Sequence, residues 1–445
     1  MNKKIIAVVL VVVLVAAGVA AAVYYTNNSK DNNAEYTING GLEVYGNADG
    51  DYKIDSADLN IIKDIIAGNK TLSDYPYADA NYDGSVDSND TKLVQKIING
   101  ESCTIYNVNA SSKTNYVVST AWPVKSALST GSSNNLLLLT MAGVADKIHG
   151  ICYSSTPDPT LFPTFSKMTS LSTSSTKMSL DAASDIIKEN KVTLLISDKT
   201  ASTISNEPDF EKAGVDVVRI DAGVVDVDTY CSYLLLIGFL FQTDSDVQEV
   251  ASWMTSLMNQ VDQKVAGVAD KATVVTTNGN GSAGAWVSAG ISNYKDVTTE
   301  AGGVYAIPDK DLSSFSKYSS GAYFGSGDTW LYNYDFDYII SIRTNDWYSG
   351  TVNVSEKYAE SMQYLTKTKA YENGNAYVMV GDGPIVLRVA YAASIMYPDL
   401  VSQDWVDSMN QEFFEKFYDK QSGTAVDFTD LFFVISKELA DKASA

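Results

Sequence analysis

The hydrophobic pattern begins with a charge-free segment. Lys3 and Lys4 are followed by an apolar run from Ile5 to Tyr25 that contains no charged residue. As a helix this run would span ~30 Å, about the thickness of the hydrocarbon core of a bilayer. We therefore predict a single-pass transmembrane anchor within residues 1–26, with a cleaved signal peptide as the alternative. The positive-inside rule places the bulk of the chain outside the cell, beyond a polar linker at residues 27–40.

A polar motif then occurs twice, from Asn47 to Asp58 and from Asp79 to Asp90. Oxygen-bearing side chains occupy positions 1, 3, 5, 9 and 12 of both copies, and position 7 contributes a backbone carbonyl. The side chains are those of Asn47, Asp49, Asp51, Asp55 and Asp58, then Asp79, Asn81, Asp83, Asp87 and Asp90, and the carbonyls are those of Lys53 and Ser85. This spacing favours two loops that bind Ca²⁺, and the alternative is two acidic turns exposed to solvent.

Each loop leads into a segment with helical hydrophobic periodicity that stops at a glycine, Gly68 or Gly100. This duplicated loop and helix resembles a type I dockerin over residues 41–101. The second loop has Gly84 at position 6, whereas the first has Tyr52 there and Asn47 at position 1. The resemblance implies bound Ca²⁺ and a cohesin partner that contacts positions 10 and 11, which are Ser56, Ala57, Ser88 and Asn89. A calcium-stiffened spacer above the membrane is the alternative role.

The remainder of the chain alternates short β-rich runs with helix-compatible segments. This pattern predicts an α/β fold with a mostly parallel sheet. One long amphipathic helix from Asp244 to Val265 separates two such sets, so we predict a lobe at residues 106–225, a linking helix at 226–268 and a second lobe at 269–445. The expected strands are Tyr116–Ser119, Ile148–Tyr153, Val192–Ser197 and Val215–Ile220, then Ala272–Thr276, Tyr338–Ser341 and Ala376–Val380, before a helix at Gln403–Phe417.

Composition excludes several functions. The chain has 32 Lys and Arg against 54 Asp and Glu, and its formal charge of −22 argues against nucleic-acid binding. The single histidine, His149, excludes zinc sites that need two imidazoles, and we interpret it as structural, with an axial metal ligand as the alternative. The three cysteines are far apart in sequence and do not indicate a disulfide scaffold, although one bridge could form, and Cys152 and Cys231 have core-like surroundings. A chain with one histidine and no GxSxG motif is not expected to be an enzyme.

The order of lobe, long helix and lobe resembles the substrate-binding proteins of ABC importers that take up cobalamin, ferric siderophores or haem. The segments that carry the resemblance are Tyr116–Pro123, Met141–Gly150, Ser179–Ser197, Val268–Gly290, Gly381–Pro384 and Arg388–Leu400. The resemblance implies two Rossmann-like lobes joined by one rigid helix, a bound metal chelate and an ABC permease as partner.

Ligands of open α/β sheets bind at the carboxyl ends of the strands, which selects the candidate residues. These are Trp122, Lys125, Tyr153, Lys199, Trp286, Arg343, Trp347 and Asp382. The aromatic side chains can stack on a planar ligand, and ordinary packing is the alternative for each. Arg388 lies in a helix-like run, where we expect a structural ion pair. Because cations are scarce, we favour a cobamide or a neutral siderophore over a highly anionic ferric catecholate.

The sequence therefore leads to a membrane-anchored, extracellular binding protein for a metal chelate. The alternative is a cell-surface scaffold or adhesion protein that acts through its dockerin-like unit and a cohesin.

Overall fold

The computed structural model describes residues 36–111, 116–130, 132–152, 157–171, 177–200, 203–281, 284–288, 293–315, 321–344 and 347–444. The chain divides into residues 1–37 and a compact unit from Ile38 to Ala445. The predicted membrane anchor at residues 1–26 and the candidate Tyr153 lie outside the described residues. Within those residues, no helix has the length and apolar character needed to cross a membrane.

The two polar repeats fold as two similar loop and helix units. Helices α2 (Ser56–Ile66) and α3 (Ser88–Ile98) follow the loops, and η1 (Leu72–Asp74) lies between them. Asp55 and Asp87 cap the two helices, and in each case the carboxylate three residues later, Asp58 or Asp90, accepts a hydrogen bond from the cap backbone. Apolar residues from both repeats form a shared small core of Ala48, Leu59, Ile62, Ala78, Ala80 and Val94. The helical periodicity of the sequence is confirmed.

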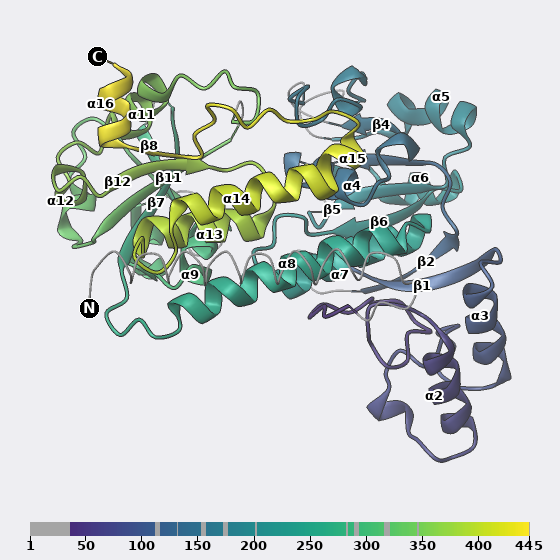
Figure 1. The fold of residues 1–445 in the computed structure, drawn as a ribbon. Coiled ribbons are helices and arrows are strands. Elements are labelled where there is room, and N and C mark those ends of the chain that lie inside the picture. The colour runs from purple at the N-terminus through teal and green to yellow at the C-terminus, as the bar shows by residue number, and fades with distance from the viewer. Residues whose placement is uncertain are drawn as a thin grey trace. The chain divides into compact units, whose positions relative to one another are not determined.

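A hairpin connects this unit to the first lobe (Figure 1). Strand β1 (Cys103–Asn109) pairs antiparallel with β2 (Tyr116–Trp122), and these two strands form a sheet of their own. The prediction that Tyr116–Ser119 joins the mostly parallel sheet is therefore wrong. The nearby strand β1 satisfies its backbone hydrogen bonds instead, which a pattern of β-forming residues does not distinguish from pairing inside the lobe.

The first lobe contains a parallel sheet with the strand order β4-β3-β5-β6. The strands are β3 (Ala127–Thr130), β4 (Ile148–Cys152), β5 (Leu194–Asp198) and β6 (Asp216–Ile220). Helices α4 (Ser133–Met141), α5 (Leu180–Asn190) and α6 (Glu207–Lys212) connect them, together with the 3-10 turns η2 (Ala145–Lys147) and η3 (Phe165–Lys167). The parallel arrangement was predicted, but β3, which lies between β4 and β5, was not.

Two helices, rather than one, occupy the predicted linking segment at residues 226–268. Helix α7 (Val227–Phe241) is buried on nearly all sides, and the chain then turns at Gln242, whose φ is +59°. Helix α8 (Asp244–Val265) follows with one buried face, as its amphipathic pattern predicts. The long helix α8 leads from the first lobe to the second (Figure 1).

The second lobe has a mixed sheet with the order β10-β8-β7-β11-β12-β13, and β9 also pairs with β7. Strands β7, β11 and β12 are parallel, whereas β8, β10 and β13 run antiparallel to their neighbours. The strands are β7 (Thr273–Gly281), β8 (Gly284–Ser288), β9 (Val304–Tyr305), β10 (Gly321–Phe324), β11 (Tyr338–Arg343), β12 (Ala376–Val380) and β13 (Val434–Ser436). The helices are α9 (Asn293–Glu300), α10 (Asp309–Phe315), η5 (Trp330–Asn333), α11 (Val354–Met362), α12 (Lys369–Glu372), α13 (Ile385–Met396), α14 (Gln403–Phe413), α15 (Asp419–Ser422) and α16 (Lys437–Ala443).

The C-terminal part of the chain returns to the first lobe. Helix α14 continues through a π-helical turn, η6 (Phe414–Tyr418), into α15. The Tyr418 hydroxyl donates a hydrogen bond to the Leu161 carbonyl, and the Gln421 amide donates to Asp246 at the start of α8 over 3.2 Å. The lobes are thus connected by α8 and also by this returning segment, which Figure 1 shows in yellow.

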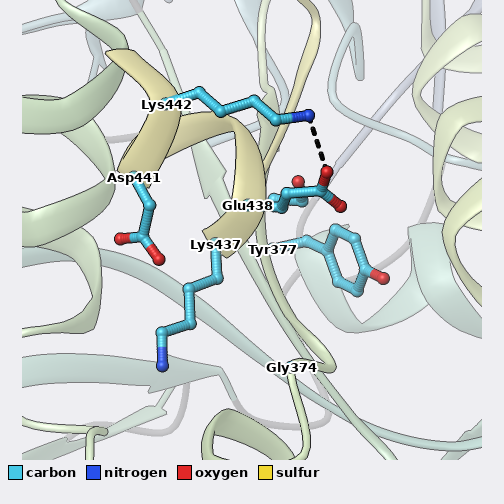
Figure 2. Close-up of a pocket in the computed structure, with 7 residues that line it drawn as sticks. Gly374, Tyr377, Lys437, Glu438, Asp441 and Lys442 are labelled. Carbon is cyan, nitrogen blue, oxygen red and sulfur yellow. Dashed lines mark hydrogen bonds and ion pairs between the residues drawn. The ribbon is translucent and has the colours of Figure 1, made fainter. Parts of the chain in front are cut away.

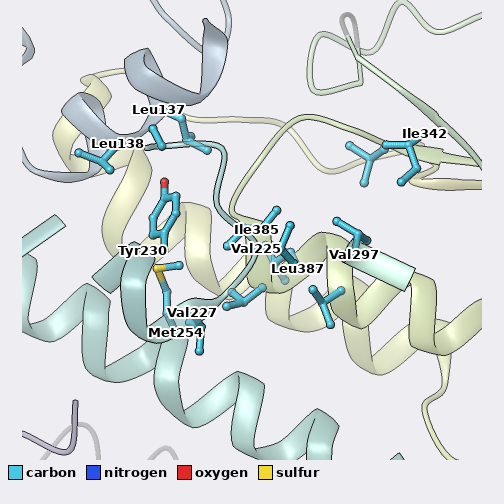
Figure 3. Packing of buried hydrophobic residues seen from close by; sticks show 14 of the residues in the cluster. Leu137, Leu138, Val225, Val227, Tyr230, Met254, Val297, Ile342, Ile385 and Leu387 are labelled. Atoms are coloured by element: carbon cyan, nitrogen blue, oxygen red, sulfur yellow. The ribbon is translucent and has the colours of Figure 1, made fainter. Parts of the chain in front are cut away.

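One hydrophobic core is continuous across both lobes. Figure 3 shows labelled members of this core from α4, α7 and α8 near others from α9 and α13. They include Leu137, Tyr230, Met254, Val297 and Leu387, all of them buried. Such shared burial favours small relative motions of the lobes over wide opening, because opening would expose apolar surface to water.

Candidate ligand-binding site

The carboxyl ends of the strands from both lobes approach each other at a polar contact. We call this contact the interlobe junction and define it by Asn134, Gly223, Asn293 and Arg388. The Arg388 guanidinium on α13 donates to the Asn134 amide oxygen on α4 over 2.7 Å. The Asn293 amide at the start of α9 donates to the Gly223 carbonyl, just after β6, over 3.3 Å.

Arg388 is the best-buried cation of the junction, with 5% of its surface exposed. Its guanidinium also donates to the Gly383 carbonyl from Nε over 3.1 Å and from Nη2 over 3.0 Å. Gly383 has a φ of +86°, and an added Cβ would lie 2.5 Å from the Tyr348 hydroxyl, so a side chain is excluded here. The expected structural ion pair of Arg388 is thus replaced by hydrogen bonds to neutral oxygens, one of them in the other lobe.

Asp382, a predicted ligand residue, lies directly after β12 and is 7% exposed. Burial raises the pKa of Tyr294 on α9, and the nearby Asp382 carboxylate raises it further, while Arg388 opposes both effects. Tyr294, Asp382 and Arg388 are therefore within electrostatic reach of one another. The structure places Asp382 beside the interlobe junction, as expected for a residue at the carboxyl end of a strand.

Lys199 also lies at the carboxyl edge of the first sheet, directly after β5. Its ammonium group pairs with Asp221, which follows β6, at 2.5 Å. Burial raises the pKa of Asp296 on α9, and the positive charges of Lys295 and Lys199 partly oppose this increase. Lys199 is therefore close enough to Asp296 of the second lobe for the two charges to interact, and its role in ligand binding stays a prediction.

Trp286 contributes an aromatic surface in the second lobe. It is half-buried on β8, and its ring meets the ring of Tyr323 on β10 at 4.7 Å in an edge-to-face arrangement. Tyr323 is 41% exposed. In the strand register Trp286 lies opposite Asn278, whose side chain hydrogen-bonds with Tyr294. Asn278, the strand neighbour of Trp286, is therefore the residue of this sheet region that contacts α9.

Two of the predicted tryptophans are core residues. Trp122 is 5% exposed, its indole donates to the Phe239 carbonyl over 2.7 Å, and its ring stacks on the Phe239 ring. Trp347 is 1% exposed and donates to the Arg343 carbonyl over 2.6 Å. Neither ring face is available to a ligand, so the packing alternative holds for both and the stacking prediction is wrong.

Two predicted cations lie away from the junction contacts. Lys125 precedes β3, so it lies at the amino end of that strand, where it contacts the Gln242 side chain at 3.5 Å. Arg343 does end β11, but its guanidinium contacts Ser361 at 3.1 Å and Glu360 at 3.6 Å on α11. The prediction for Lys125 is wrong because the strand that precedes it, β2, belongs to the separate hairpin, and Lys125 leads into the amino end of β3.

The histidine and cysteines agree with the structural interpretation. His149 is half-buried near the start of β4, at the end opposite the carboxyl edge of the sheet. Cys152 and Cys231 are buried, and none of the three cysteines forms a disulfide. Sequence reasoning did not select Asn134, Asn293 or Tyr294 as site residues. The only signal for Asn134 was its place just before the apolar run of α4, and the sequence held no comparable signal for Asn293, because α9 is polar.

A surface depression elsewhere does not coincide with the predicted site. It measures about 690 Å³ and lies beside α16, with Tyr377, Lys437, Glu438, Asp441 and Lys442 in its lining. Figure 2 shows Lys442 paired with Glu438, at 2.6 Å. Tyr377 is near the amino end of β12, so this depression is at the edge of the sheet opposite Asp382.

The two acidic loops hold several carboxylates close together. Burial raises the pKa of Asp58 to about 7, and the carboxylates of Asp49 and Asp51 add to the increase. Burial likewise raises the pKa of Asp90, with contributions from Asp79 and Asp83. The carboxylates of each loop therefore lie near enough to repel one another, a repulsion that a bound cation would relieve.

The loops also use neutral oxygens. In the described residues, no three His, Cys, Asp or Glu side chains converge closely enough to hold a metal ion by themselves. A cation therefore needs the amide and backbone oxygens as well, such as those of Asn47, Asn81, Lys53 and Ser85. Asn47 is fully buried and its Oδ1 has no hydrogen-bond partner, which fits an oxygen ligand at position 1 of the first loop. The residues present thus fit Ca²⁺.

Comparison with known proteins identifies the fold. The chain is similar to a TroA-like periplasmic binding protein, FepB, from Veillonella parvula, with a TM-score of 0.54 and 13% identity over 74% of this chain and 99% of that chain. It is also similar to a periplasmic solute-binding protein from the same organism, with a TM-score of 0.50 and 15% identity over 72% and 97% of the chains. No protein-family model matches the sequence, and no curated protein matches it. The chain has the two-lobe α/β fold of periplasmic binding proteins.

Proposed function

We propose that the protein is the solute-binding component of an ABC importer and that it binds a metal chelate between its lobes. The observation that carries the proposal is the interlobe junction, where residues at the strand ends of two lobes meet within a periplasmic-binding-protein fold. Open α/β sheets bind ligands at these strand ends, and two facing lobes can enclose a bulky ligand from both sides.

The aromatic residues of β8 and β10 and the cations at the strand ends favour a particular kind of chelate. Trp286 and Tyr323 offer a partly exposed aromatic pair to a planar or ring-containing ligand. Lys199 and Arg343 already have acidic partners, Asp221 and Glu360, so they do not supply uncompensated positive charge. A cobamide, haem or neutral ferric siderophore is therefore favoured over a highly anionic ferric catecholate.

Membrane attachment and calcium binding complete the proposal. Residues 1–26 anchor the chain in the cell membrane, and the described part lies outside the cell, where it delivers its ligand to an ABC permease. The two polar loops bind Ca²⁺ through the residues named above, and bound Ca²⁺ neutralises their clustered carboxylates. The supports are the charge-free segment Ile5–Tyr25 and, for Ca²⁺, the unpartnered Asn47 oxygen.

A ligand titration tests the chelate proposal. Tryptophan fluorescence and visible absorbance of the full chain would be followed while cobalamin, haem and a panel of ferric siderophores are added. We expect saturable binding of one of them at micromolar or lower concentration. The variant Trp286→Phe should weaken this binding, whereas Trp405→Phe, which removes a half-buried tryptophan of α14, should leave it unchanged.

The same experiment separates the proposal from its alternative. If none of the chelates binds, the solute-receptor function is wrong. Calcium-dependent capture of a purified cohesin by the same chain would then favour the cell-surface scaffold. Ser56, Ala57, Ser88 and Asn89, at which the dockerin resemblance places the partner, are all exposed.

A further inference from the structure

The segment before the first polar loop belongs structurally to the binding domain. Val44 bridges Asn107 of β1, the Tyr45 amide donates to the Tyr106 carbonyl over 2.8 Å, and the Val108 amide donates to the Glu43 carbonyl over 3.1 Å. The segment Leu42–Tyr45 thus pairs with β1 along one edge of the hairpin. Leu42 and Val44 are also buried in the core that continues through both lobes. The loop unit, which comprises both polar loops and their helices at residues 41–101, is therefore packed against the first lobe and not attached to it by a free linker.

The residues just before this segment contact the two helices that follow the first lobe. The Gly41 amide donates to the Ser232 hydroxyl of α7 over 3.2 Å, and the Asn39 amide lies 3.5 Å from the Thr255 hydroxyl of α8. A Cβ added to Gly40 would lie 2.4 Å from the Asp228 carbonyl, so only glycine permits this close approach. Residues 38–40, which were predicted to be linker, are therefore packed against the domain.

Asn47 connects this segment to the first loop. Its Nδ2 donates to the Leu42 carbonyl over 2.8 Å and to the Asp51 carbonyl over 2.7 Å, while the Leu42 amide donates to the Asp51 carbonyl over 2.8 Å. The amide orientation is determined by these contacts, because the reverse orientation would place Oδ1 against two carbonyl oxygens. The remaining atom, Oδ1, is buried without a partner at the first ligand position of the loop.

We propose that Asn47 couples calcium in the first loop to the joint between the loop unit and the binding domain. This inference rests on the proposed binding of Ca²⁺. Oδ1 contributes to the cation site, and Nδ2 of the same amide holds the segment that pairs with β1 and contacts α7. An aspartate at this position would still offer oxygen to the cation, but it has no hydrogen to donate to the Leu42 and Asp51 carbonyls. Asn47, at the position where the second loop has Asp79, thus contributes both an oxygen to the cation site and a hydrogen-bond donor to the joint.

Because one side chain contacts both the cation site and the joint, calcium binding should oppose opening of the joint. Opening the joint breaks the Asn47 contacts and disturbs the loop, so a cation that binds only the intact loop opposes the opening. At a free Ca²⁺ concentration of about 100 times its dissociation constant, this linkage slows opening-dependent exchange by about 100-fold. Bound Ca²⁺ therefore holds the loop unit in a fixed orientation on the solute-binding domain.

Amide hydrogen exchange of the full chain, with Ca²⁺ and with a chelator, tests the proposal, and calorimetry measures calcium binding in parallel. We expect Ca²⁺ to slow exchange strongly at the amides of Leu42, Tyr45 and Val108. In Asn47→Asp, calcium binding should persist while this slowing is lost at Tyr45 and Val108. If Asn47→Asp keeps the full slowing, or if the wild-type chain binds Ca²⁺ with no change at these amides, the coupling is wrong and calcium binding stands.

Two matched variants cover the case in which Asn47→Asp does not fold. Asp49→Asn weakens the first loop at an exposed ligand position, and Asp83→Asn does the same in the second loop. Slowing at Tyr45 should need more Ca²⁺ in Asp49→Asn than in Asp83→Asn, and the reverse order would overturn the proposal. Failure of the wild-type chain to bind any Ca²⁺ would instead refute the calcium sites themselves, a result that calorimetry distinguishes from a failure of coupling.

Discussion

The contact between Arg388 and Asn134 should contribute measurably to holding the lobes together. Its donor and acceptor are 2.7 Å apart, and Arg388 is 5% exposed while Asn134 is half-buried. A hydrogen bond to a charged group contributes about 1.5–3 kcal/mol, and partial exposure of the acceptor places this one near about 1.5 kcal/mol. A change of that size corresponds to roughly a tenfold shift in an equilibrium between joined and separated lobes.

A double-mutant cycle measures this contribution. The variants Asn134→Ala, Arg388→Gln and their combination would be unfolded with urea and followed by tryptophan fluorescence, with m-values checked for constancy. We expect a coupling free energy of about 1.5 kcal/mol between the two substitutions. As a control, Asn190→Ala removes an exposed asparagine amide on α5 and should combine additively with Arg388→Gln. Additivity of Asn134→Ala with Arg388→Gln to within about 0.5 kcal/mol would show that this hydrogen bond does not hold the lobes together.

Three further predictions concern the predicted site residues. Trp122→Ala should destabilise the protein by about 3–5 kcal/mol, because it empties a core position, and thermal unfolding would show this as a large drop in Tm; an unchanged Tm would contradict the burial argument. Lys199→Ala should change unfolding free energy by less than about 1 kcal/mol, since its pair with Asp221 is partly exposed, and denaturant titration checks this. Asp90→Asn should lower calcium affinity at the second loop, and calorimetry that still finds two unaltered sites would exclude Asp90 as a ligand.

The sequence predicted those elements that depend on interactions between residues only a few positions apart. The helices α2 and α3 follow from the hydrophobic periodicity after each polar loop, and their capping boxes involve residues three positions apart. The length and one-sided burial of α8 also follow from its sequence. The placement of Lys199 and Asp382 after strands was predictable as well, because a buried run followed by a polar turn identifies a strand end.

The sequence did not indicate which aromatic residues pack inside the core and which stay partly exposed, where a ligand could reach them. Trp122, Trp286 and Trp347 looked alike as aromatic residues in loops near strands, yet Trp122 and Trp347 are buried and Trp286 is partly exposed. Strand β3 was missed because Ala127–Thr130 is too short to show a period, and its burial comes from β4 and β5 on either side. Burial depends on elements that are distant in sequence, so no local pattern determines it.

Local signals in the sequence were enough to predict the two polar loops, the long linking helix and an acidic α/β chain with one histidine. Only the tertiary structure placed Arg388 against Asn134, which are 254 positions apart, and paired the segment before the first loop with β1. The physical reason is the range of the interactions involved. Capping and helical periodicity act within a few residues of the chain, whereas the interlobe junction and the joint at Asn47 exist only once folding brings distant segments into hydrogen-bonding distance.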